Sequence, residues 1–171
     1  MKSTCCIGNL AGATDRYMRS IIVAYTLSDR TIGRAGSLPW NLPKDMKWFR
    51  SMTLGKTVVM GRKTYESLPC YPQGLPARTN IVLSTTLKTD AVVVAASMEE
   101  VMQYVGDREV IFIGGEKLYQ SALPFVDTVF ATEIFANYKG DTHFPQLEGN
   151  WFPKLVLESD DFRVVSYRRL P

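Results

Sequence analysis

Short apolar runs alternate with helical segments along most of this chain, and this alternation limits the available folds more than any other feature. Runs with the length and composition of strands occupy residues 20–27, 57–60, 80–84, 91–95, 110–113 and 128–134. Several are apolar at successive positions, as in strands buried on both faces of a parallel sheet. Ser97 and Glu100 form a capping box that begins one helix, and helical spacing predicts another over residues 116–123. The alternation predicts a single α/β domain with a mostly parallel central sheet of about eight strands and about four flanking helices.

The two ends of the chain break this alternation. Residues 155–170 have the pattern of two strands that turn at residues 159–161, which predicts an antiparallel hairpin at the sheet edge. Residues 1–19 mix Gly, Asn, Thr and Asp with short apolar stretches, unlike a secretory signal. We expect these residues to form a flexible leader and residues 20–171 to form the folded domain.

Composition excludes several classes of protein. Apolar residues make up 46% of the chain and charged residues 22%, which is typical of globular proteins and unlike disordered ones. The 20 Lys and Arg residues are dispersed among 17 Asp and Glu residues, which gives little support to nucleic-acid binding. No apolar run reaches the roughly 18 residues of a membrane span.

Three cysteines without a CxxC pattern predict neither a disulfide framework nor a metal site, so we expect a cytoplasmic protein. The single histidine, His143, is expected in a loop without a functional role.

One acidic residue lies where an apolar side chain is expected. Pro43 suits the first position of a helix over residues 43–52, and at about 100° per residue Asp45 falls near the middle of its apolar face. This face also carries Met46, Trp48, Phe49 and Met52. The helix dipole favours a carboxylate in the first turn by about 0.3–1 kcal/mol, but an apolar environment costs it more. Two explanations stay open here: a structural role at the helix start, or contact with a buried partner that donates hydrogen bonds.

Two glycine turns each join a strand to a helix start. Gly61 follows the run TVVM and precedes the RKT of residues 62–64, and Gly114 and Gly115 follow the run VIFI. Backbone N–H groups at helix starts bind anions, and neighbouring cations strengthen such sites. Basic residues beside a turn are also commonly just solvated, so this signal alone decides nothing. Neither turn matches the GxGxxG fingerprint of Rossmann folds.

Six segments, taken in order, resemble the dihydrofolate reductase family over nearly the whole chain after the leader. They are IIVAYTLSDRTIG, LPWNLPKDMKWF, MGRKTYESLP, NIVLS, VIFIGGEKLY and GDTHFP. The resemblance implies reduction of dihydrofolate to tetrahydrofolate with NADPH, by hydride transfer to pterin C6 and protonation of N5. It also implies a monomer that binds antifolate inhibitors.

The resemblance assigns contacts to the substrate. Asp45 would accept hydrogen bonds from the pterin ring, and Thr132 would hold Asp45 from behind. Arg78 would bind the glutamate carboxylate of the substrate, a task that suits its planar guanidinium. Trp40 and Leu38 would belong to a loop that closes over the nicotinamide. The other implied substrate contacts are Val23, Ala24, Met46, Phe49, Leu75 and Ile113.

For NADPH, the resemblance places Arg62 and Ser84 near the adenosine phosphates, within an adenosine-binding subdomain of about residues 56–108. The other implied cofactor contacts are Ala24, Ile32, Gly33, Gly61, Lys63, Thr64, Leu83, Gly114, Gly115, Glu116, Lys117, Leu118 and Tyr119.

The second glycine turn has further implied features. The peptide bond between Gly114 and Gly115 is expected to be cis. Tyr119 would lie near the transferring hydride, although a purely structural role as a core aromatic stays open. The chain departs from common family patterns at Glu116 and at Tyr25.

Two other functions stay open for this sequence. A related reductase of the same fold acts on a ribosylaminopyrimidine in riboflavin synthesis, but it needs neither Arg78 nor an apolar helix face that carries Asp45. A non-catalytic homologue that only binds folate would be favoured by loss of Asp45 or Arg78, and both residues are present.

Overall fold

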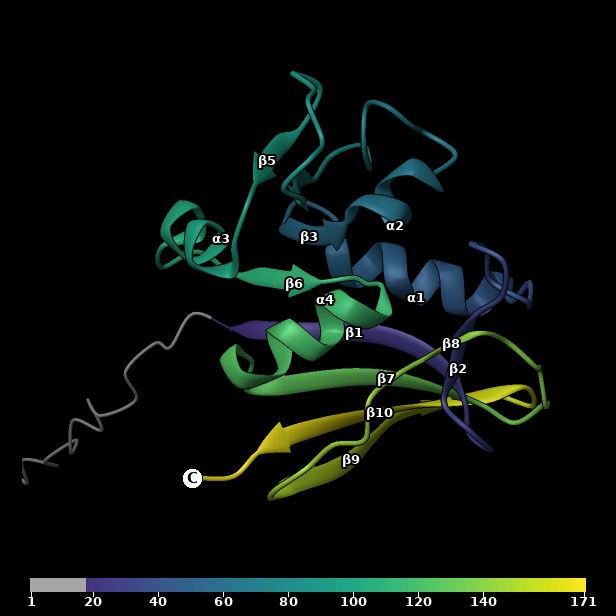
Figure 1. Cartoon of the computed structure of the whole chain (residues 1–171). Helices are drawn as coiled ribbons and strands as arrows, with labels where there is room; N and C mark the ends of the chain where they lie inside the picture. The colour runs from purple at the N-terminus through teal and green to yellow at the C-terminus, as the bar shows by residue number, and fades with distance from the viewer. Residues whose placement is uncertain (1–17) are drawn as a thin grey trace, which may run out of the picture.

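The computed structural model describes residues 18–171, with a sheet of eight strands at its centre (Figure 1). Across the sheet the order is β5 (Val93–Ala95), β4 (Thr79–Leu83), β3 (Thr57–Gly61), β6 (Val110–Phe112), β1 (Arg19–Thr26), β7 (Thr128–Ile134), β10 (Phe162–Arg169) and β9 (Trp151–Glu158). Strands from β5 to β7 run parallel, whereas β10 and β9 pair antiparallel. The predicted sheet and C-terminal hairpin are confirmed, although the hairpin begins earlier than expected, at Trp151 instead of residue 155.

The helices cover both faces of this sheet. In the described part of the chain they are α1 (Pro43–Thr53), α2 (Arg62–Glu66), α3 (Met98–Val105), α4 (Glu116–Ala122) and the short 3-10 helix η1 (Leu123–Phe125). Ser97 caps α3 by accepting a hydrogen bond from the N–H of Glu100 at 3.2 Å, as the capping box predicts.

Alternation along the strands decides which helix covers which face. Ile21, Val23 and Tyr25 of β1 belong to the core cluster that includes residues of α3 and α4. Ala24 points to the opposite face and packs in the cluster that contains Trp40 and Trp48, on the side of α1. The fold is therefore a three-layer α/β/α arrangement, and β1 is buried on both faces, as its unbroken apolar run predicts.

A second, two-stranded sheet is not predicted by the sequence pattern. β2 (Thr31–Gly33) pairs antiparallel with β8 (Thr142–His143). The expectation that His143 lies in a loop is wrong, because His143 is in β8 and pairs with Thr31. Strands this short carry no readable periodicity, so a contact between distant segments determines them.

The predicted leader, residues 1–19, lies outside the described residues except for its last two. Arg19 already belongs to β1, so the folded part begins at or before that residue. No helix within residues 18–171 is long and apolar enough to cross a membrane.

Candidate active site

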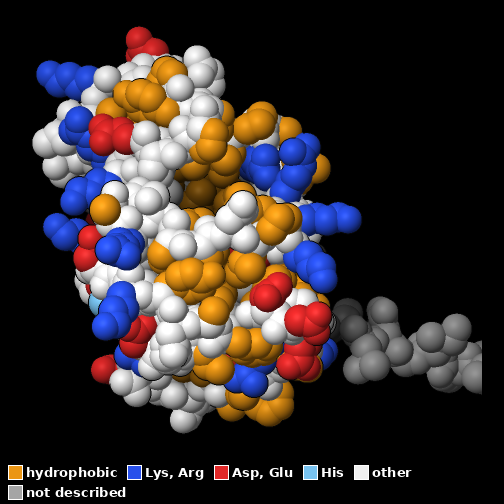
Figure 2. Space-filling view, turned by 90° about the vertical axis from the view of Figure 1, so that its right-hand side faces the viewer, with side chains coloured by type: hydrophobic (Ala, Val, Ile, Leu, Met, Phe, Trp, Pro, Cys, Tyr) orange, Lys and Arg blue, Asp and Glu red, His pale blue; other side chains and the backbone are white. Residues whose placement is uncertain are grey.

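The parallel strands end together on the right of Figure 1, where β2 and the loop before α1 also lie. Ligands of open α/β sheets bind outside the carboxyl ends of the strands. Figure 2 views the molecule from this side and shows a hollow with hydrophobic side chains in and around it and Lys and Arg side chains near its rim. The candidate site is built around this edge of the sheet.

Asp45 is a buried carboxylate in the first turn of α1. Asp45 is 7% exposed, and Thr132 Oγ1 of β7 donates a hydrogen bond to Asp45 Oδ1 at 2.7 Å. Burial raises the pKa of Asp45, and the hydrogen bond from Thr132 opposes that rise. One hydroxyl donor cannot satisfy two carboxylate oxygens, so Asp45 retains acceptor capacity for a ligand with hydrogen-bond donors.

The apolar face of α1 surrounds Asp45, as its spacing predicts. Trp48, Phe49 and Met52 are half-buried. Met46 is 51% exposed and lies at the edge of the face, because the helix turns about 100° between Asp45 and the next residue. This exposure agrees with the helical spacing, which places Met46 at the end of the apolar arc.

Arg78, which directly precedes β4, has its guanidinium fixed by protein oxygens. Nε and Nη2 donate to Thr53 Oγ1 at 3.2 and 3.0 Å, and Nη1 donates to Pro76 O at 2.7 Å. Thr53 in turn donates to the carbonyl of Phe49 at 2.9 Å. Burial and the charge of Arg50 lower the pKa of Arg78. The guanidinium is thus held in one orientation beside the C-terminal end of α1, with a second cation near it.

Sequence reasoning missed Thr53, although a signal was present. Asp45, Phe49 and Thr53 follow one another at intervals of four residues, so they share one stripe of α1. A hydroxyl that continues the stripe of a buried carboxylate and an aromatic ring is a candidate for the same site.

The two glycine turns lie against each other. Gly61 N–H donates to Gly114 O at 2.7 Å, and a Cβ on Gly115 would lie 3.6 Å from Thr64 Oγ1. The bond between Gly114 and Gly115 is cis, as the resemblance implies. Helices α2 and α4 begin at these turns, and neither has a side-chain cap at its N-terminus. Their first N–H groups are therefore free of side-chain acceptors and suit a phosphate-bearing ligand.

Tyr119 of α4 lies directly behind the second turn. Its hydroxyl donates to Ile22 O at 3.0 Å, and it would lie only 3.0 Å from a Cβ on Gly114. Burial, and less strongly the charge of Asp45, raise the pKa of Tyr119. Tyr119 is therefore a buried, neutral phenol of the core directly behind this turn, and its place near a transferring hydride stays a prediction.

Arg62 and Ser84 lie at the ends of neighbouring strands, as expected. Arg62 Nε pairs with Glu66 at 2.7 Å, and Nη1 donates to Thr86 Oγ1 at 2.8 Å. Ser84 Oγ accepts hydrogen bonds from the N–H groups of Thr86 and Leu87 and so fixes this turn. Sequence reasoning did not find the contact of Thr86 with Arg62, since only the parallel pairing of β3 with β4 brings the two residues together.

The carboxylate of Glu116, a departure from the common family pattern, accepts a hydrogen bond from the backbone N–H of His143 at 3.1 Å. Glu116 thereby ties the start of α4 to β8. Lys63 and Lys117 are exposed at the two helix starts.

The loop between β2 and α1 has one buried and one exposed residue of interest. Trp40 is 8% exposed, and its indole N–H is buried without a hydrogen-bond partner among the described residues. Leu38 is 52% exposed. Ala35 N–H donates to Asp141 Oδ2 at 2.9 Å, which attaches the start of this loop to the segment before β8.

The remaining predicted contacts lie on the central strands or beside them. Ala24 is the register partner of Thr132, and the N–H of Ile113 donates to Val59 O at 2.9 Å at the end of β6. The others lie in the core clusters or at their edges: Val23, Ile32, Leu75, Leu83 and Leu118. Gly33 packs closely on Thr142, where a Cβ would lie 2.6 Å from the Thr142 hydroxyl.

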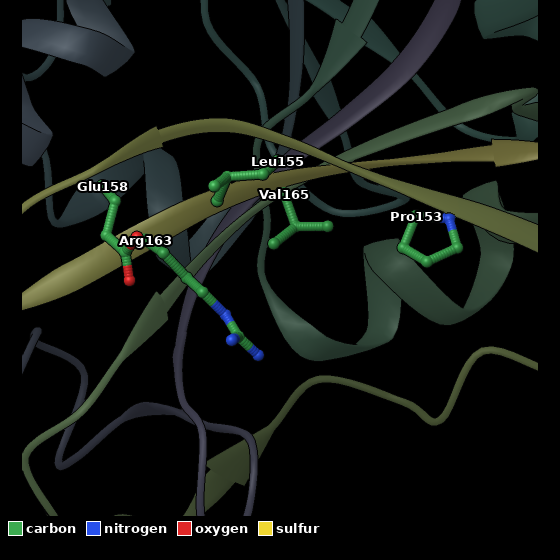
Figure 3. Close-up of a pocket in the computed structure, with 5 residues that line it drawn as sticks. All are labelled: Pro153, Leu155, Glu158, Arg163 and Val165. Carbon is green, nitrogen blue, oxygen red and sulfur yellow. The ribbon is translucent and has the colours of Figure 1, made fainter.

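A shallow pocket of about 290 Å³ lies away from this site, on β9 and β10 (Figure 3). Its lining consists of Pro153, Leu155, Glu158, Arg163 and Val165. It contains none of the residues described above. Within residues 18–171, no group of three or more His, Cys, Asp or Glu side chains is arranged to hold a metal ion.

The fold and the site together define a single-domain α/β protein with a ligand site at the carboxyl edge of its parallel strands. The family model for dihydrofolate reductase matches residues 18–162. Dihydrofolate reductase of Haemophilus influenzae is 44% identical over 146 residues, which cover 84% of this chain and 87% of the relative. Dihydrofolate reductase HdrB of Haloferax volcanii is 36% identical over 166 residues, which cover 91% and 86% of the two chains.

A solved structure is also similar. Dihydrofolate reductase from Enterococcus faecalis, complexed with NADP(H) and RAB-propyl, superimposes with a TM-score of 0.74 at 32% identity, over 90% of this chain and 97% of that one. The chain belongs to the dihydrofolate reductase family.

Proposed function

We propose that this chain reduces dihydrofolate to tetrahydrofolate with NADPH. The observation that carries this proposal is the buried Asp45 carboxylate, held by Thr132 on the apolar face of α1 at the ligand-binding edge of the sheet. An aromatic heterocycle with an amino group and a ring N–H matches this combination, because it fills an apolar hollow and offers two donors to one carboxylate.

The other substrate contacts follow from the same geometry. Arg78 is fixed by Thr53 and Pro76 and binds the carboxylate of the glutamate moiety. Phe49, between Asp45 and Thr53 on α1, packs against the ring system that joins the pterin to that glutamate. The buried, unpartnered indole N–H of Trp40 serves as a further donor near the pterin. The further substrate contacts proposed are Val23, Ala24, Leu38, Met46, Leu75 and Ile113.

The residues present also fit NADPH. Two uncapped helix starts lie at adjoining glycine turns, where the lack of side chains lets the backbone approach a ligand closely. Arg62 and Thr86 supply donors beside the first glycine turn, at Gly61, as a 2′-phosphate requires. The further cofactor contacts proposed are Ala24, Ile32, Gly33, Gly61, Lys63, Thr64, Leu83, Ser84, Gly115, Glu116, Lys117, Leu118 and Tyr119, with residues 56–108 as the adenosine-binding part.

In this mechanism the protein aligns its ligands and supplies an electric field. When bound, NADPH supplies the hydride that is transferred to pterin C6. Asp45 stabilises the positive charge that develops on the pterin when N5 is protonated, and its effect is large because the surroundings are apolar. The apolar groups around Asp45 exclude bulk water, and Thr132 fixes the orientation of the carboxylate.

NADPH oxidation, followed with and without dihydrofolate, tests this proposal. Turnover that requires dihydrofolate supports it. Turnover with a ribosylaminopyrimidine instead would identify the related reductase of riboflavin synthesis, and folate binding without turnover would identify a non-catalytic homologue. The same protein in a sedimentation experiment tests the proposed monomer.

A further inference from the structure

Glu133 is a buried carboxylate that the proposed reaction does not use. It follows Thr132 on β7, so its side chain lies on the face of the sheet opposite to Asp45. Glu133 is 2% exposed and accepts hydrogen bonds from three side chains: Tyr25 Oη at 3.2 Å, Tyr167 Oη at 2.5 Å and Arg163 Nε at 2.6 Å. These donors come from β1 and β10, the two strands beside β7.

The three donors differ in exposure and in the part of the protein that they contact. Arg163 is partly exposed and lines the shallow pocket on β9 and β10, where Glu158 also lies (Figure 3). Tyr167 is half-buried on the same outer strand. Tyr25 is 6% exposed and belongs to the central core cluster. Of the three donors, Tyr25 is therefore the one that extends from Glu133 into the interior.

A continuous set of contacts runs from Tyr25 to the second glycine turn. The ring of Tyr25 stacks on Phe144, with 5.5 Å between centroids and 16° between planes. Phe144 meets the ring of Tyr119 edge to face at 5.2 Å and 73°. The hydroxyl of Tyr119 lies so near Gly114 that a Cβ there would be 3.0 Å away. The main chain of Phe144 is held separately, because its N–H donates to Arg30 O and its carbonyl accepts from Arg30 Nε.

A carboxylate buried beside a partly exposed Arg163 is weak evidence for added stability, because its desolvation offsets much of the attraction between the charges. Three donors on one carboxylate do, however, restrict the rotation of each donor. Burial and the nearby Glu133 raise the pKa of Tyr25, so its hydroxyl remains protonated and able to donate. The hydrogen bond to Glu133 therefore fixes the plane of the Tyr25 ring, and Phe144 stacks on that ring.

We propose that Tyr25, held by Glu133, is a positioning residue for the cofactor side of the site: it fixes Phe144 and, through Phe144, keeps Tyr119 against the Gly114 turn. The expected effect on cofactor binding and hydride transfer rests on the proposed function. The effect on the order of Phe144 and Tyr119 does not, because it exists in the protein without ligands.

Two substitutions separate this role from a merely structural one. Tyr25→Phe and Tyr167→Phe each remove one hydroxyl donor from the same carboxylate, but among these two rings only Tyr25 stacks on Phe144. The hydrogen bond from Tyr167 is the shorter, at 2.5 against 3.2 Å, so a purely structural role predicts that Tyr167→Phe does more damage to every property. The positioning role predicts the opposite order at the cofactor side.

Three measurements give the readouts. Amide hydrogen exchange of Phe144 and Tyr119 is measured in the unliganded protein, NADPH affinity by fluorescence titration, and the deuterium isotope effect on hydride transfer in single turnovers. We expect Tyr25→Phe to speed the exchange of both amides and to weaken NADPH binding, each by about fivefold, the equivalent of one hydrogen bond. The deuterium isotope effect on hydride transfer in Tyr25→Phe should rise, because the nicotinamide and the substrate would be aligned less uniformly. Tyr167→Phe should lower the thermal midpoint while leaving these three readouts within about twofold of the wild type.

Glu133→Met provides the second variant, since it keeps about the length of the side chain and removes both acceptor oxygens. It should reproduce the effects of Tyr25→Phe, and the double variant should be no worse than either single one, because both break the same connection. The proposal would be overturned if Tyr167→Phe changed amide exchange and NADPH affinity as much as Tyr25→Phe does, or more. It would also be overturned if the effects of Tyr25→Phe and of the Glu133 substitution added up in the double variant. A wild-type protein that does not reduce dihydrofolate would contradict the proposed function, whereas the exchange measurements would still decide the positioning role.

Discussion

Replacement of Asp45 by Asn should change activity and stability in opposite directions. Asn has nearly the shape of Asp and can still accept the 2.7 Å hydrogen bond from Thr132, so the fold is retained. The substitution removes the negative charge that favours a protonated pterin. Loss of one such electrostatic group from a water-excluded site typically lowers kcat by about 10²–10³-fold, and we expect a loss of this size at pH 7.

The pH dependence follows from the raised pKa of Asp45. Burial raises the pKa above the ordinary value of 3.8, so the carboxylate stays ionised at neutral pH only at some cost to folding. As the pH falls through the raised pKa, the wild-type carboxylate is itself neutralised and solvent supplies protons directly. The activities of wild type and Asp45→Asn should therefore converge in acid.

Stability should respond in the other sense. A carboxyl group with a raised pKa in the folded state contributes most stability when protonated, below the pKa of the unfolded chain, and loses that contribution as the pH rises through the folded pKa. Asn does not ionise, so at pH 7 the variant should be more stable than the wild type and should have a higher thermal midpoint. This gain should vanish below about pH 4, where Asp is protonated in both states.

Steady-state kinetics and thermal unfolding, both followed from about pH 3 to pH 8, test this reasoning together. Thr132→Val serves as a matched control, because it removes the neighbouring hydroxyl but leaves the charge of Asp45. It should lose far less activity than Asp45→Asn at pH 7. Near-native turnover of Asp45→Asn at pH 7, or a variant that is less stable than wild type there, would refute the assignment of Asp45 as a buried, functional carboxylate.

Three further predictions follow from named contacts. Arg62→Ala should weaken NADPH by about tenfold or more and leave NADH nearly unchanged, since a charge-assisted hydrogen bond to the 2′-phosphate is lost; equal weakening of both cofactors in titrations would exclude that role. Gly114→Ala should reduce both NADPH affinity and the midpoint of urea unfolding, because Gly114 has φ +119° and its Cβ would lie 3.0 Å from Tyr119 Oη; an unaltered protein would show that the turn is not closely packed. Thr53→Val should raise the KM for dihydrofolate by about tenfold with little change in kcat, because Arg78 loses the acceptor of two of its hydrogen bonds; a fall in kcat at constant KM would place Arg78 elsewhere in the mechanism.

The sequence alone determined the features that depend on neighbours along the chain. The apolar runs decided the strands, and Ser97 with Glu100 decided the start of α3, because these signals operate within a few residues. The place of Asp45 on a buried helix face also followed from sequence, since helical periodicity fixes the direction of each side chain relative to the next. Arg62 and the glycine turns were readable in the same way, as residues at or just beyond the end of a strand.

Only the tertiary structure decided which distant groups meet. Thr86 reaches Arg62 because strand order and register bring separate segments to one edge of the sheet. Thr132 reaches Asp45 for the same reason, and before the structure only the family resemblance, not any local pattern, implied that contact. Glu133 illustrates the limit most clearly: its sequence neighbourhood is that of an ordinary buried strand, yet it accepts hydrogen bonds from three side chains on two other strands. A local pattern specifies the face on which a side chain lies, whereas its partners depend on long-range pairing, which no short stretch of sequence encodes.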